Sequence, residues 1–426
     1  MRDVHVVAVG MTPFGRFPDL GIKELAAGAI ERLLADTTLT LDEVEAAWMS
    51  NAGWGIRTGQ HCIRGQVALF PLGLEQIPVM NVENACAGGA SAFHGAYLGV
   101  ASGAYDVALA VGAEQLSLPA SASGEDRAKS FSSFLAGTDV EVTTRLIEQM
   151  REAGEPPGEG SGGGDRGARR GGGGAGGGGD RSPFMDFYSM AARAHMDRYG
   201  TTAAQLAAIA AKNHVHGSHN PDAQYRFPMT VEEVLADRVV SPPLTRAMCA
   251  PMGDGAAAAL LVSGERMARI EGARPVRVRA ATLGSGSLTA NDVASRVASR
   301  AYEASGLGPE DVDVAEVHDA TAFGELIQTE HLGFCPEGEG GPYAASGATA
   351  LGGSRPVNPS GGLECRGHPI GATGLAQIVE IVTQLRGEAG DRQVEGARIG
   401  LTENGGGAIG TGEAALAVCL LEGASR

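Results

Sequence analysis

Lysine is almost missing from this chain, which removes one kind of covalent chemistry. The 426 residues contain only Lys23, Lys129 and Lys212, and the other basic side chains are arginines and histidines. Schiff-base catalysis needs a lysine amine as nucleophile, so it has few candidates here. A net positive charge is lacking as well, because the formal charge is −17 at pH 7. We therefore do not expect nucleic acid or an anionic membrane as the main partner.

Cysteines are few and irregularly spaced, and long apolar runs are absent. No Cys-x-x-Cys pair occurs, which for a chain of this length indicates reduced thiols rather than a disulfide framework. No apolar run approaches the roughly 20 residues that span a bilayer. Because the first residues run directly into a strand pattern at Val4, we expect no signal peptide and a soluble, cytoplasmic protein. The six cysteines are Cys62, Cys86, Cys249, Cys335, Cys365 and Cys419.

What is present is an alternation of strand and helix patterns, which is typical of layered α/β folds. The order helix, acidic turn, strand occurs at Ala29–Glu45 and again at Ser299–Asp313. Similarity at this range indicates duplication of one α/β unit. The patterns predict strands at Val4–Val9, Val44–Met49, Tyr105–Gly112, Ala256–Val262 and Ala414–Leu421, and helices at Ile22–Leu34, Ala87–Gly103, Met190–Tyr199 and Ala203–His214.

A glycine- and arginine-rich stretch, Gly154–Arg181, interrupts the alternation. It has too few apolar residues to offset its ordering entropy, so we expect a flexible surface loop. We divide the chain into an N-terminal half at residues 1–116 and a C-terminal half at 267–426. Between them we expect an inserted loop domain at 117–240, which contains residues 154–181, and a return to the first half at about 241–266.

The surroundings of Cys86 indicate chemistry most clearly. It lies in Asn84–Ala90, a run of small residues that opens the helix predicted from Ala87. A thiol at a helix N-terminus lies at the positive end of the helix dipole, so we expect a lowered pKa and a thiolate. The small neighbours leave room for a carbonyl group to approach the sulfur. We predict covalent acyl catalysis on Cys86, against the alternative of a buried structural thiol.

Further segments offer the partners that a nucleophile needs. One is a second small-residue turn that enters a helix and carries a histidine. In the duplicated register this helix corresponds to the helix after Cys86, so two facing halves would bring both helix N-termini toward one centre. The segments are Glu316–Ala320 with His318, Gly367–Gly374 with His368, and Glu403–Gly407, in which Glu403 and Asn404 precede three glycines.

With these motifs the chain resembles the thiolase superfamily, specifically the sterol-carrier-protein-type thiolases and bacterial thiolase-like acetyl-CoA acetyltransferases. The resemblance covers nearly the whole chain, including Asn213–His216 and Cys249–Ala256. It implies an α/β fold of duplicated βαβαβαββ halves in a five-layered αβαβα sandwich. It also implies that Cys86 takes an acyl group from a CoA thioester, that His368 activates this cysteine, and that His318 donates a hydrogen bond to the thioester oxygen.

The same resemblance implies a homodimer and, for this branch, a small partner protein that combines a zinc ribbon with an OB-fold. No bound cofactor is implied, since the CoA thioester is a substrate. CoA carries phosphates, so an acidic protein needs a locally basic mouth to receive it. An acyl carrier protein stays open as the donor.

The chain departs from the family at the second catalytic cysteine. A full thiolase uses a second acid/base to remove the α-proton of another acyl-CoA, yet the HDCF-like motif has Ala320, and Glu403 and Asn404 precede the glycines. Three outcomes stay open: Glu403 is the base, the Cys-His-His set supports decarboxylating condensation, or the acyl group passes to another acceptor. The alternative from a different class is a non-catalytic subunit that binds acyl-CoA or scaffolds the small partner.

Gly405, Gly406 and Gly407 begin a G-x-G-x-x-G pattern after a strand. A dinucleotide fingerprint needs a helix next, and the next segment reads as a strand. We therefore assign these glycines to backbone that lies against the active centre and the bound thioester. A cluster of histidines at a helix end lacks acidic or cysteine partners, so we expect a solvated or substrate-lining loop and no metal site. This cluster comprises His214, His216 and His219.

Two weaker signals lie near these segments. Cys365 precedes His368 by three residues and is a minor candidate for the missing thiol. The phenylalanines that flank the glycine-rich stretch either pack in the core or line an acyl tunnel. They are Phe131, Phe134, Phe184 and Phe187.

Overall fold

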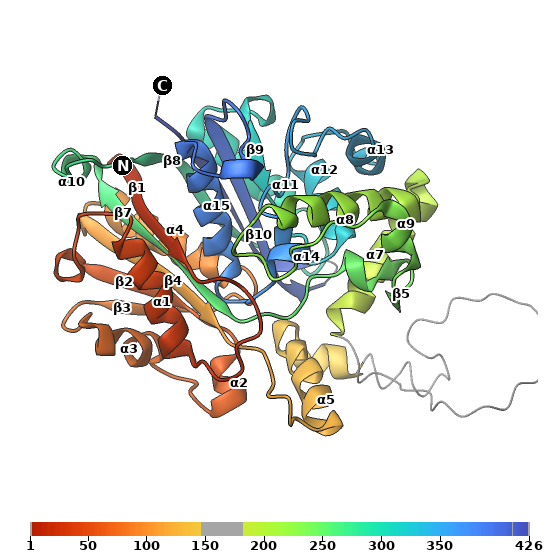
Figure 1. The fold of residues 1–426 in the computed structure, drawn as a ribbon, viewed down its shortest axis with the longest axis horizontal. Coiled ribbons are helices and arrows are strands. Elements are labelled where there is room, and N and C mark those ends of the chain that lie inside the picture. The colour runs from red at the N-terminus through yellow and green to blue at the C-terminus, as the bar shows by residue number, and fades with distance from the viewer. Residues whose placement is uncertain (1, 146–181, 411, 425–426) are drawn as a thin grey trace, which may run out of the picture.

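The computed structural model describes residues 2–145, 182–410 and 412–424 (Figure 1). The stretch Gly154–Arg181, predicted to be a surface loop, lies outside these residues. Within them, no helix has both the length and the apolar character needed to cross a bilayer.

One large mixed sheet organises the described chain. Its nine strands follow the order β3-β2-β4-β7-β1-β8-β11-β10-β9, and β5 and β6 form a separate pair. The strands are β1 (Val4–Met11), β2 (Ala46–Ser50), β3 (Val79–Val82), β4 (Val107–Glu114), β5 (Val239–Ser241), β6 (Leu244–Thr245), β7 (Gly255–Ser263), β8 (Val276–Ser285), β9 (Val314–Glu316), β10 (Ile399–Ile409) and β11 (Gly412–Glu422).

The large sheet consists of two halves with the same strand order and directions. In the first half, β2 runs parallel to β4, and β4, β7 and β1 are successively antiparallel. In the second half, β9 runs parallel to β10, and β10, β11 and β8 are successively antiparallel. The predicted duplication is therefore confirmed. The counterpart of β3 in the second half is a single bridge between Ala315 and Val357.

Helices complete five layers around the two half-sheets. The central helices α4 (Gly88–Ala101) and α15 (Thr373–Arg386) pack against each other, and one hydrophobic core joins both to strands of both halves. A second core joins the first half to α1 (Ile22–Leu34). A third joins the second half to α11 (Val293–Ser305). Figure 1 shows α15, in blue, between the N-terminal strands and β10. The expected α/β sandwich is confirmed.

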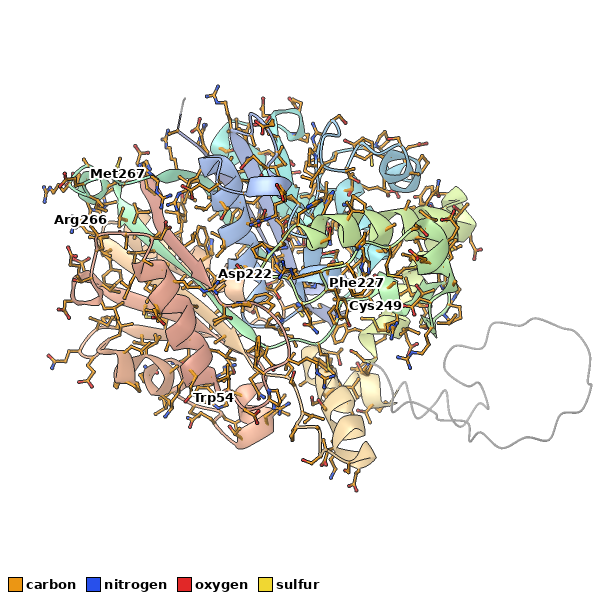
Figure 2. All side chains as sticks on the ribbon, viewed as in Figure 1. Trp54, Asp222, Phe227, Cys249, Arg266 and Met267 are labelled. Atoms are coloured by element: carbon orange, nitrogen blue, oxygen red, sulfur yellow. The ribbon has the colours of Figure 1, made fainter. Side chains whose placement is uncertain are left out.

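Shorter helices connect these layers. In the first half these are α2 (Trp54–Thr58) and α3 (Arg64–Leu69), with α10 (Gly264–Met267) following β7. Figure 2 labels Trp54, Arg266 and Met267, which mark α2 and α10. The second half adds α12 (Ala322–His331), α13 (Gly340–Ala345) and α14 (Gly362–Arg366).

The insertion between β4 and β7 covers the C-terminal half. Its helix α8 packs against α9, α12, α13 and α14. Figure 1 shows α8 and α9, in green, over that side of the molecule. The Thr202 hydroxyl caps α8 by accepting the N–H of Gln205. The described helices of the insertion are α5 (Gly124–Ser133), α7 (Phe184–Tyr199), α8 (Ala203–Ser218) and α9 (Val231–Ala236).

Candidate active site

Cys86 lies in a tight turn between β3 and α4. The preceding Ala85 has φ +48°, a left-handed conformation that costs a residue with a Cβ about 1–2 kcal/mol. The N–H groups of Ala87 and Gly88 close the turn onto the carbonyls of Asn84 and Ala85. Ala87 is the N-cap of α4, so the thiol stands one residue before the cap. The strained turn fixes the direction in which the sulfur points.

His368 contacts Cys86 directly. Its Nε2 lies 3.1 Å from Cys86 Sγ, and its Nδ1 lies 2.7 Å from Thr373 Oγ1. The Thr373 hydroxyl donates to the carbonyl of Pro369, so its oxygen accepts the proton of Nδ1. This arrangement leaves Nε2 without a proton and ready to accept the thiol proton of Cys86. The geometry is that of a nucleophile, a base and a group that orients the base.

His318 is the third member of the cluster. The ligand atoms of Cys86, His318 and His368 all lie within 4.8 Å of one another, and the two imidazole rings meet edge to face at 5.2 Å. Asn404 Nδ2 lies 3.1 Å from His318 Nδ1. With the amide as donor, Nδ1 accepts and the ring proton stays on Nε2. His318 therefore carries a hydrogen-bond donor that it can offer to a carbonyl oxygen.

The electrostatics of Cys86 differ from the sequence prediction. Burial, followed by the negative charge of Glu114, raises the pKa of Cys86 to about 12. The N–H of Gly407 donates to the sulfur and opposes this rise. The predicted lowering of the pKa by the helix dipole is thus wrong, because the sulfur loses more solvation than the helix end returns. Burial also lowers the pKa of His368 well below its usual value, so at rest the thiol and the imidazole are both neutral.

Glu403 and Asn404 lie on β10 directly behind His318. Glu403 Oε2 accepts the backbone N–H of His318 at 2.8 Å, while its other oxygen has no partner. Burial, helped by the charge of Glu413, raises the pKa of Glu403 to about 8. Both side chains are fully buried, and neither lines the cavity described below. In this geometry the two residues hold His318, Glu403 through its backbone and Asn404 through its ring.

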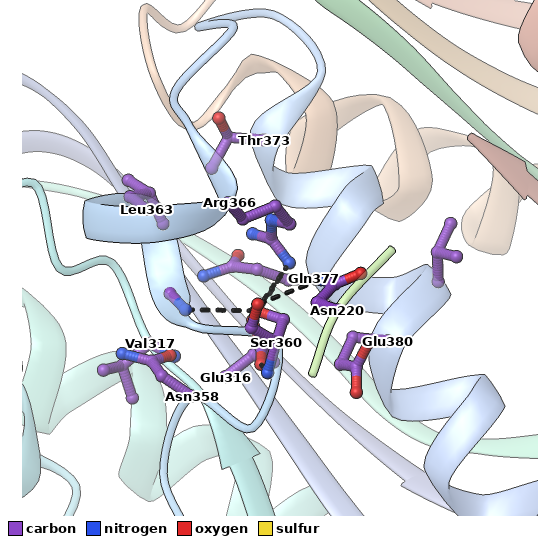
Figure 3. A network of polar contacts seen from close by, with 12 residues as sticks. Asn220, Glu316, Val317, Asn358, Ser360, Leu363, Arg366, Thr373, Gln377 and Glu380 are labelled. Atoms are coloured by element: carbon purple, nitrogen blue, oxygen red, sulfur yellow. Dashed lines mark hydrogen bonds and ion pairs between the residues drawn. The ribbon is translucent and has the colours of Figure 1, made fainter. Parts of the chain in front are cut away.

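A buried ion pair connects the two histidine segments (Figure 3). Arg366 Nη1 donates to Glu316 Oε2 at 3.0 Å, and Ser360 donates to the same carboxylate. Glu316 precedes His318 by two residues, and Arg366 precedes His368 by two. Glu316, Ser360 and Arg366 are at most 1% exposed. Because a buried charge is costly without its partner, this contact fixes the separation of the two histidines.

A cavity of about 1690 Å³ opens onto the cluster. Cys86, His318 and His368 lie in its wall, together with Gly405, Gly406 and Gly407. Among its described lining residues, Cys86 is the sole cysteine. The cavity is large enough for a drug-sized or larger ligand, since such sites commonly measure roughly 300–1,000 Å³.

The insertion supplies much of the apolar wall. Phe134, Phe184 and Phe187 line the cavity, so of the two alternatives left open by the sequence, these three have a lining position. The side chain of Phe131 lies outside the described residues.

The described wall of the cavity is not basic. Among its lining residues, aspartates and glutamates outnumber arginines and lysines. Arg198 lies 3.8 Å from Glu337, and Lys129 pairs with Glu125, so two of the basic side chains have acidic neighbours. The basic lining residues are Arg57, Lys129 and Arg198, and the acidic ones are Glu83, Asp126, Asp139, Glu337 and Glu413.

The other predicted candidates lie away from the cluster. His214 and His216 are buried on α8, which contradicts the expected solvated loop. His216 bonds to the Asn358 carbonyl and to the N–H of Leu351, whereas His214 lies against Tyr225 and Phe227. Both histidines lie on the buried face of α8, which packs into the core, and the prediction of a solvated loop at the helix end was therefore wrong. Figure 2 labels Phe227 and the buried Cys249 in this region.

The remaining histidine and thiol also stand apart. His219 is the C-cap of α8. Cys365 is fully buried on α14 and does not line the cavity. It is therefore not placed to act as the missing thiol.

Sequence reasoning missed three residues at the site. Thr373 stands five positions after His368, and its place in the first turn of the following helix is a signal that could have found it. Tyr188 and Glu413 also line the cavity. They come from the insertion and from the β10–β11 hairpin, which carry no local motif, so only the folded chain brings them to the site.

The duplicated fold and the Cys-His pair between its central helices define a thiolase-type enzyme. The family model described as the N-terminal domain of thiolase matches residues 4–150, and the one described as thiolase C-terminal domain-like matches residues 280–418. An acetyl-CoA acetyltransferase of Methanothermobacter thermautotrophicus is 37% identical over 419 residues, covering 96% of this chain and 98% of that protein. The chain therefore belongs to the thiolase family.

Other similar proteins carry related names. The benzoylsuccinyl-CoA thiolase subunit BbsB of Thauera aromatica is 33% identical, covering 95% of each chain. Bovine sterol carrier protein 2 is 34% identical, covering 94% of this chain and 69% of that protein. Among solved structures, the Ltp2-ChsH2(DUF35) aldolase has a TM-score of 0.75 at 22% identity, covering 100% of this chain and 98% of that chain. Human mitochondrial 3-ketoacyl-CoA thiolase has 0.69 at 15%, covering 100% and 99%. At these identities the structures support the fold alone.

Proposed function

We propose that this protein transfers acyl groups through a thioester on Cys86, with an acyl-CoA as donor. The observation that carries the proposal is the 3.1 Å contact between His368 Nε2 and Cys86 Sγ in the wall of the large cavity. The names of the acetyl-CoA acetyltransferase and the benzoylsuccinyl-CoA thiolase subunit support a CoA thioester as the donor.

Acylation begins from the neutral pair. As Cys86 attacks the thioester carbonyl, its proton passes to His368 Nε2, and Thr373 holds the resulting imidazolium in place. The Nε2–H of His318 stabilises the negative charge that develops on the carbonyl oxygen. The CoA sulfur leaves and takes the proton from His368, so the acyl-enzyme forms with no net change in protonation. Deprotonation only upon attack suits a thiol whose pKa burial has raised to about 12.

The overall reaction depends on which acceptor takes the acyl group from Cys86. Thiolysis, condensation with a second acyl-CoA, and transfer to another acceptor all use the same acyl-enzyme. A decarboxylating condensation would also suit the Cys-His-His set. The ordered tautomers of both histidines favour an enzyme over the alternative of a non-catalytic subunit that binds acyl-CoA.

Assembly and location complete the proposal. We propose a homodimer in the cytoplasm, where the cysteines, all free in the structure, stay reduced. A small partner with a zinc ribbon and an OB-fold is a further proposed component. The aldolase name that joins Ltp2 with ChsH2(DUF35) supports a search for such a second polypeptide. Acidic residues outnumber basic ones in the described cavity wall, which does not favour the phosphates of CoA, so the test includes a carrier-protein thioester beside acyl-CoA.

Intact-protein mass spectrometry tests the proposal. The protein is incubated with acetyl-, butyryl- and octanoyl-CoA and with the corresponding acyl carrier protein thioesters, and Cys86→Ala and Cys62→Ala are treated in parallel. We expect an added acyl mass in the wild type and in Cys62→Ala, whose thiol is exposed, and none in Cys86→Ala. Absence of any adduct in the wild type, with and without co-purified protein, would favour the non-catalytic subunit.

A further inference from the structure

The cavity contains a carboxylate that the acylation step does not use. Glu413 stands at the start of β11 and lines the cavity. Gln328 Nε2, on α12, donates to its Oε1 at 2.9 Å. One carboxylate oxygen is thus anchored by a neutral amide, and the side chain lies in the cavity wall.

The Glu413 side chain lies over the glycine run that contacts Cys86. A Cβ built on Gly405 would lie 2.9 Å from Glu413 Cγ and 3.5 Å from its Oε1. Two residues further along, the N–H of Gly407 donates to the Cys86 sulfur. A Cβ on Gly406 would lie 2.3 Å from the carbonyl oxygen of Asn84 and 2.2 Å from the nitrogen of Ala87, so the glycine run packs directly against the turn that carries Cys86. Glu413 and Cys86 line the same cavity, in which a substrate can contact both.

Tyr188, on α7, lies in the same cavity wall as Glu413 and Cys86. The pKa of its hydroxyl is raised well above the usual value, first by burial and then by the negative charge of Glu413. The tyrosine therefore lies within electrostatic reach of Glu413.

Glu403 is less suited to meet a substrate. Its carboxylate is bound to the His318 backbone, lies outside the cavity wall and has a pKa raised to about 8. Glu413 lies beside it, because a Cβ on Gly405 would also lie 3.6 Å from Glu403 Oε1. When two adjacent carboxyl groups have different surroundings, one commonly stays protonated as an acid while the other stays ionised as a base.

We propose that Glu413 is the acid/base that acts on the α-carbon of the second acyl-CoA, in the place of the missing second cysteine. This inference rests on the proposed acyl transfer by Cys86. Glu413 takes the α-proton, so a C–H bond breaks and an O–H bond forms, while the Nε2–H of His318 bonds to the enolate oxygen. The α-carbon attacks the acyl carbonyl, the new C–C bond forms, and the bond to Cys86 Sγ breaks. The proton on Glu413 returns to the Cys86 thiolate, which regenerates both groups and releases a 3-ketoacyl-CoA.

The two half-reactions separate this role from that of Cys86. Acylation is followed by intact mass, and α-proton removal by the exchange of C2 hydrogens of acetyl-, butyryl- and octanoyl-CoA for deuterium in D2O. We expect Glu413→Gln to acylate within about twofold of the wild type while exchange and condensation fall roughly 10²-fold or more, the usual contribution of a general base. Glu413→Asp keeps the carboxylate and should recover part of the exchange. Glu337→Gln makes the same change of charge elsewhere in the cavity wall and should exchange like the wild type.

The outcomes distinguish the two proposals. If the wild type forms no acyl adduct, the acyl-transfer function itself fails. If the adduct forms and Glu413→Gln exchanges like the wild type, only the role of Glu413 is refuted. An acylated wild type that exchanges no α-hydrogen refutes that role as well. A fall in both acylation and exchange in Glu413→Gln, without recovery in Glu413→Asp, would assign the residue to the structure of the cavity.

Discussion

Gly112 offers a direct test of how the two halves position His368, the proposed base. It is buried in β4, and a Cβ at this position would lie 2.2 Å from the carbonyl oxygen of Gly371. Gly371 belongs to the turn that carries His368, and Glu114, two residues after Gly112, accepts the Gly371 N–H. A methyl group at Gly112 would therefore clash with the backbone of Gly371, which cannot easily move because Glu114 on the same strand already binds its N–H.

The expected effect of Gly112→Ala follows from this distance. The contact falls about 1 Å short of an ordinary one, and a backbone carbonyl cannot rotate away as a side chain can. Overpacking of this kind costs typically about 1–3 kcal/mol, or roughly 1–3 °C in Tm for a chain of this length. A displacement of about 1 Å at a reacting group can cost roughly 10²-fold in rate. We therefore expect acylation of Cys86 to slow by about 10²-fold while the protein stays folded.

A matched variant separates misplacement from instability. Gly400→Ala on β10, the counterpart of β4 in the second half, would place a Cβ 2.4 Å from Cγ2 of Ile381 on α15. Its clash is with the end of a side chain rather than with the histidine turn. Gly400→Ala should also lose stability in thermal unfolding, though less than Gly112→Ala because the Ile381 side chain can move. Only Gly112→Ala should acylate slowly in rapid-quench mass spectrometry, and by more than any loss of folded protein explains.

One result would refute this reasoning. If Gly112→Ala acylates at the rate of Gly400→Ala, the clash is relieved somewhere other than the His368 turn. The rigid contact between β4 and that turn would then not be what positions the base.

Two further predictions concern the groups around the histidines. Thr373→Val removes the oxygen that accepts the Nδ1 proton of His368. It should slow acylation at least about 10-fold, since the wrong tautomer of a catalytic histidine can cost about 10⁴-fold. The control Thr383→Val removes a hydroxyl that bonds within α15 and should acylate at the wild-type rate, so equal rates in the two variants would contradict the tautomer argument. The pKa of Glu403 is raised to about 8 from 4.5, so its contribution to stability is fully present below pH 4.5 and is lost as the pH rises through about 8. Glu403→Gln should therefore gain stability relative to the wild type between pH 5 and pH 9 in urea unfolding, and a difference that does not change with pH would show that the carboxyl group is not protonated in the native state.

Local chemistry in the sequence determined much of the site before any contact was known. The small residues around Cys86 and His368 predict tight turns at helix entries, because only such residues permit close backbone approach. The repeated helix, acidic turn and strand predict two equivalent units, and equivalence alone places both turns on corresponding helices. The structure confirms this correspondence through α4 and α15, which pack in one central layer.

Tertiary structure decided the charges and the supporting contacts. The pKa of Cys86 depends on how completely the folded chain removes water from the sulfur, and no local pattern gives that quantity, so the helix-dipole argument had the wrong sign. The same is true of the histidines on α8, whose burial arises from the insertion that packs over the second half. Glu413 reaches the cavity only because β11 pairs with the glycine-containing strand β10. No motif in the sequence around Glu413 indicates that pairing. The sequence by itself thus determined the turn around Cys86 and the prediction that this thiol is the nucleophile. Packing decided which polar groups surround the thiol, because desolvation and hydrogen-bond geometry exist only once the halves meet.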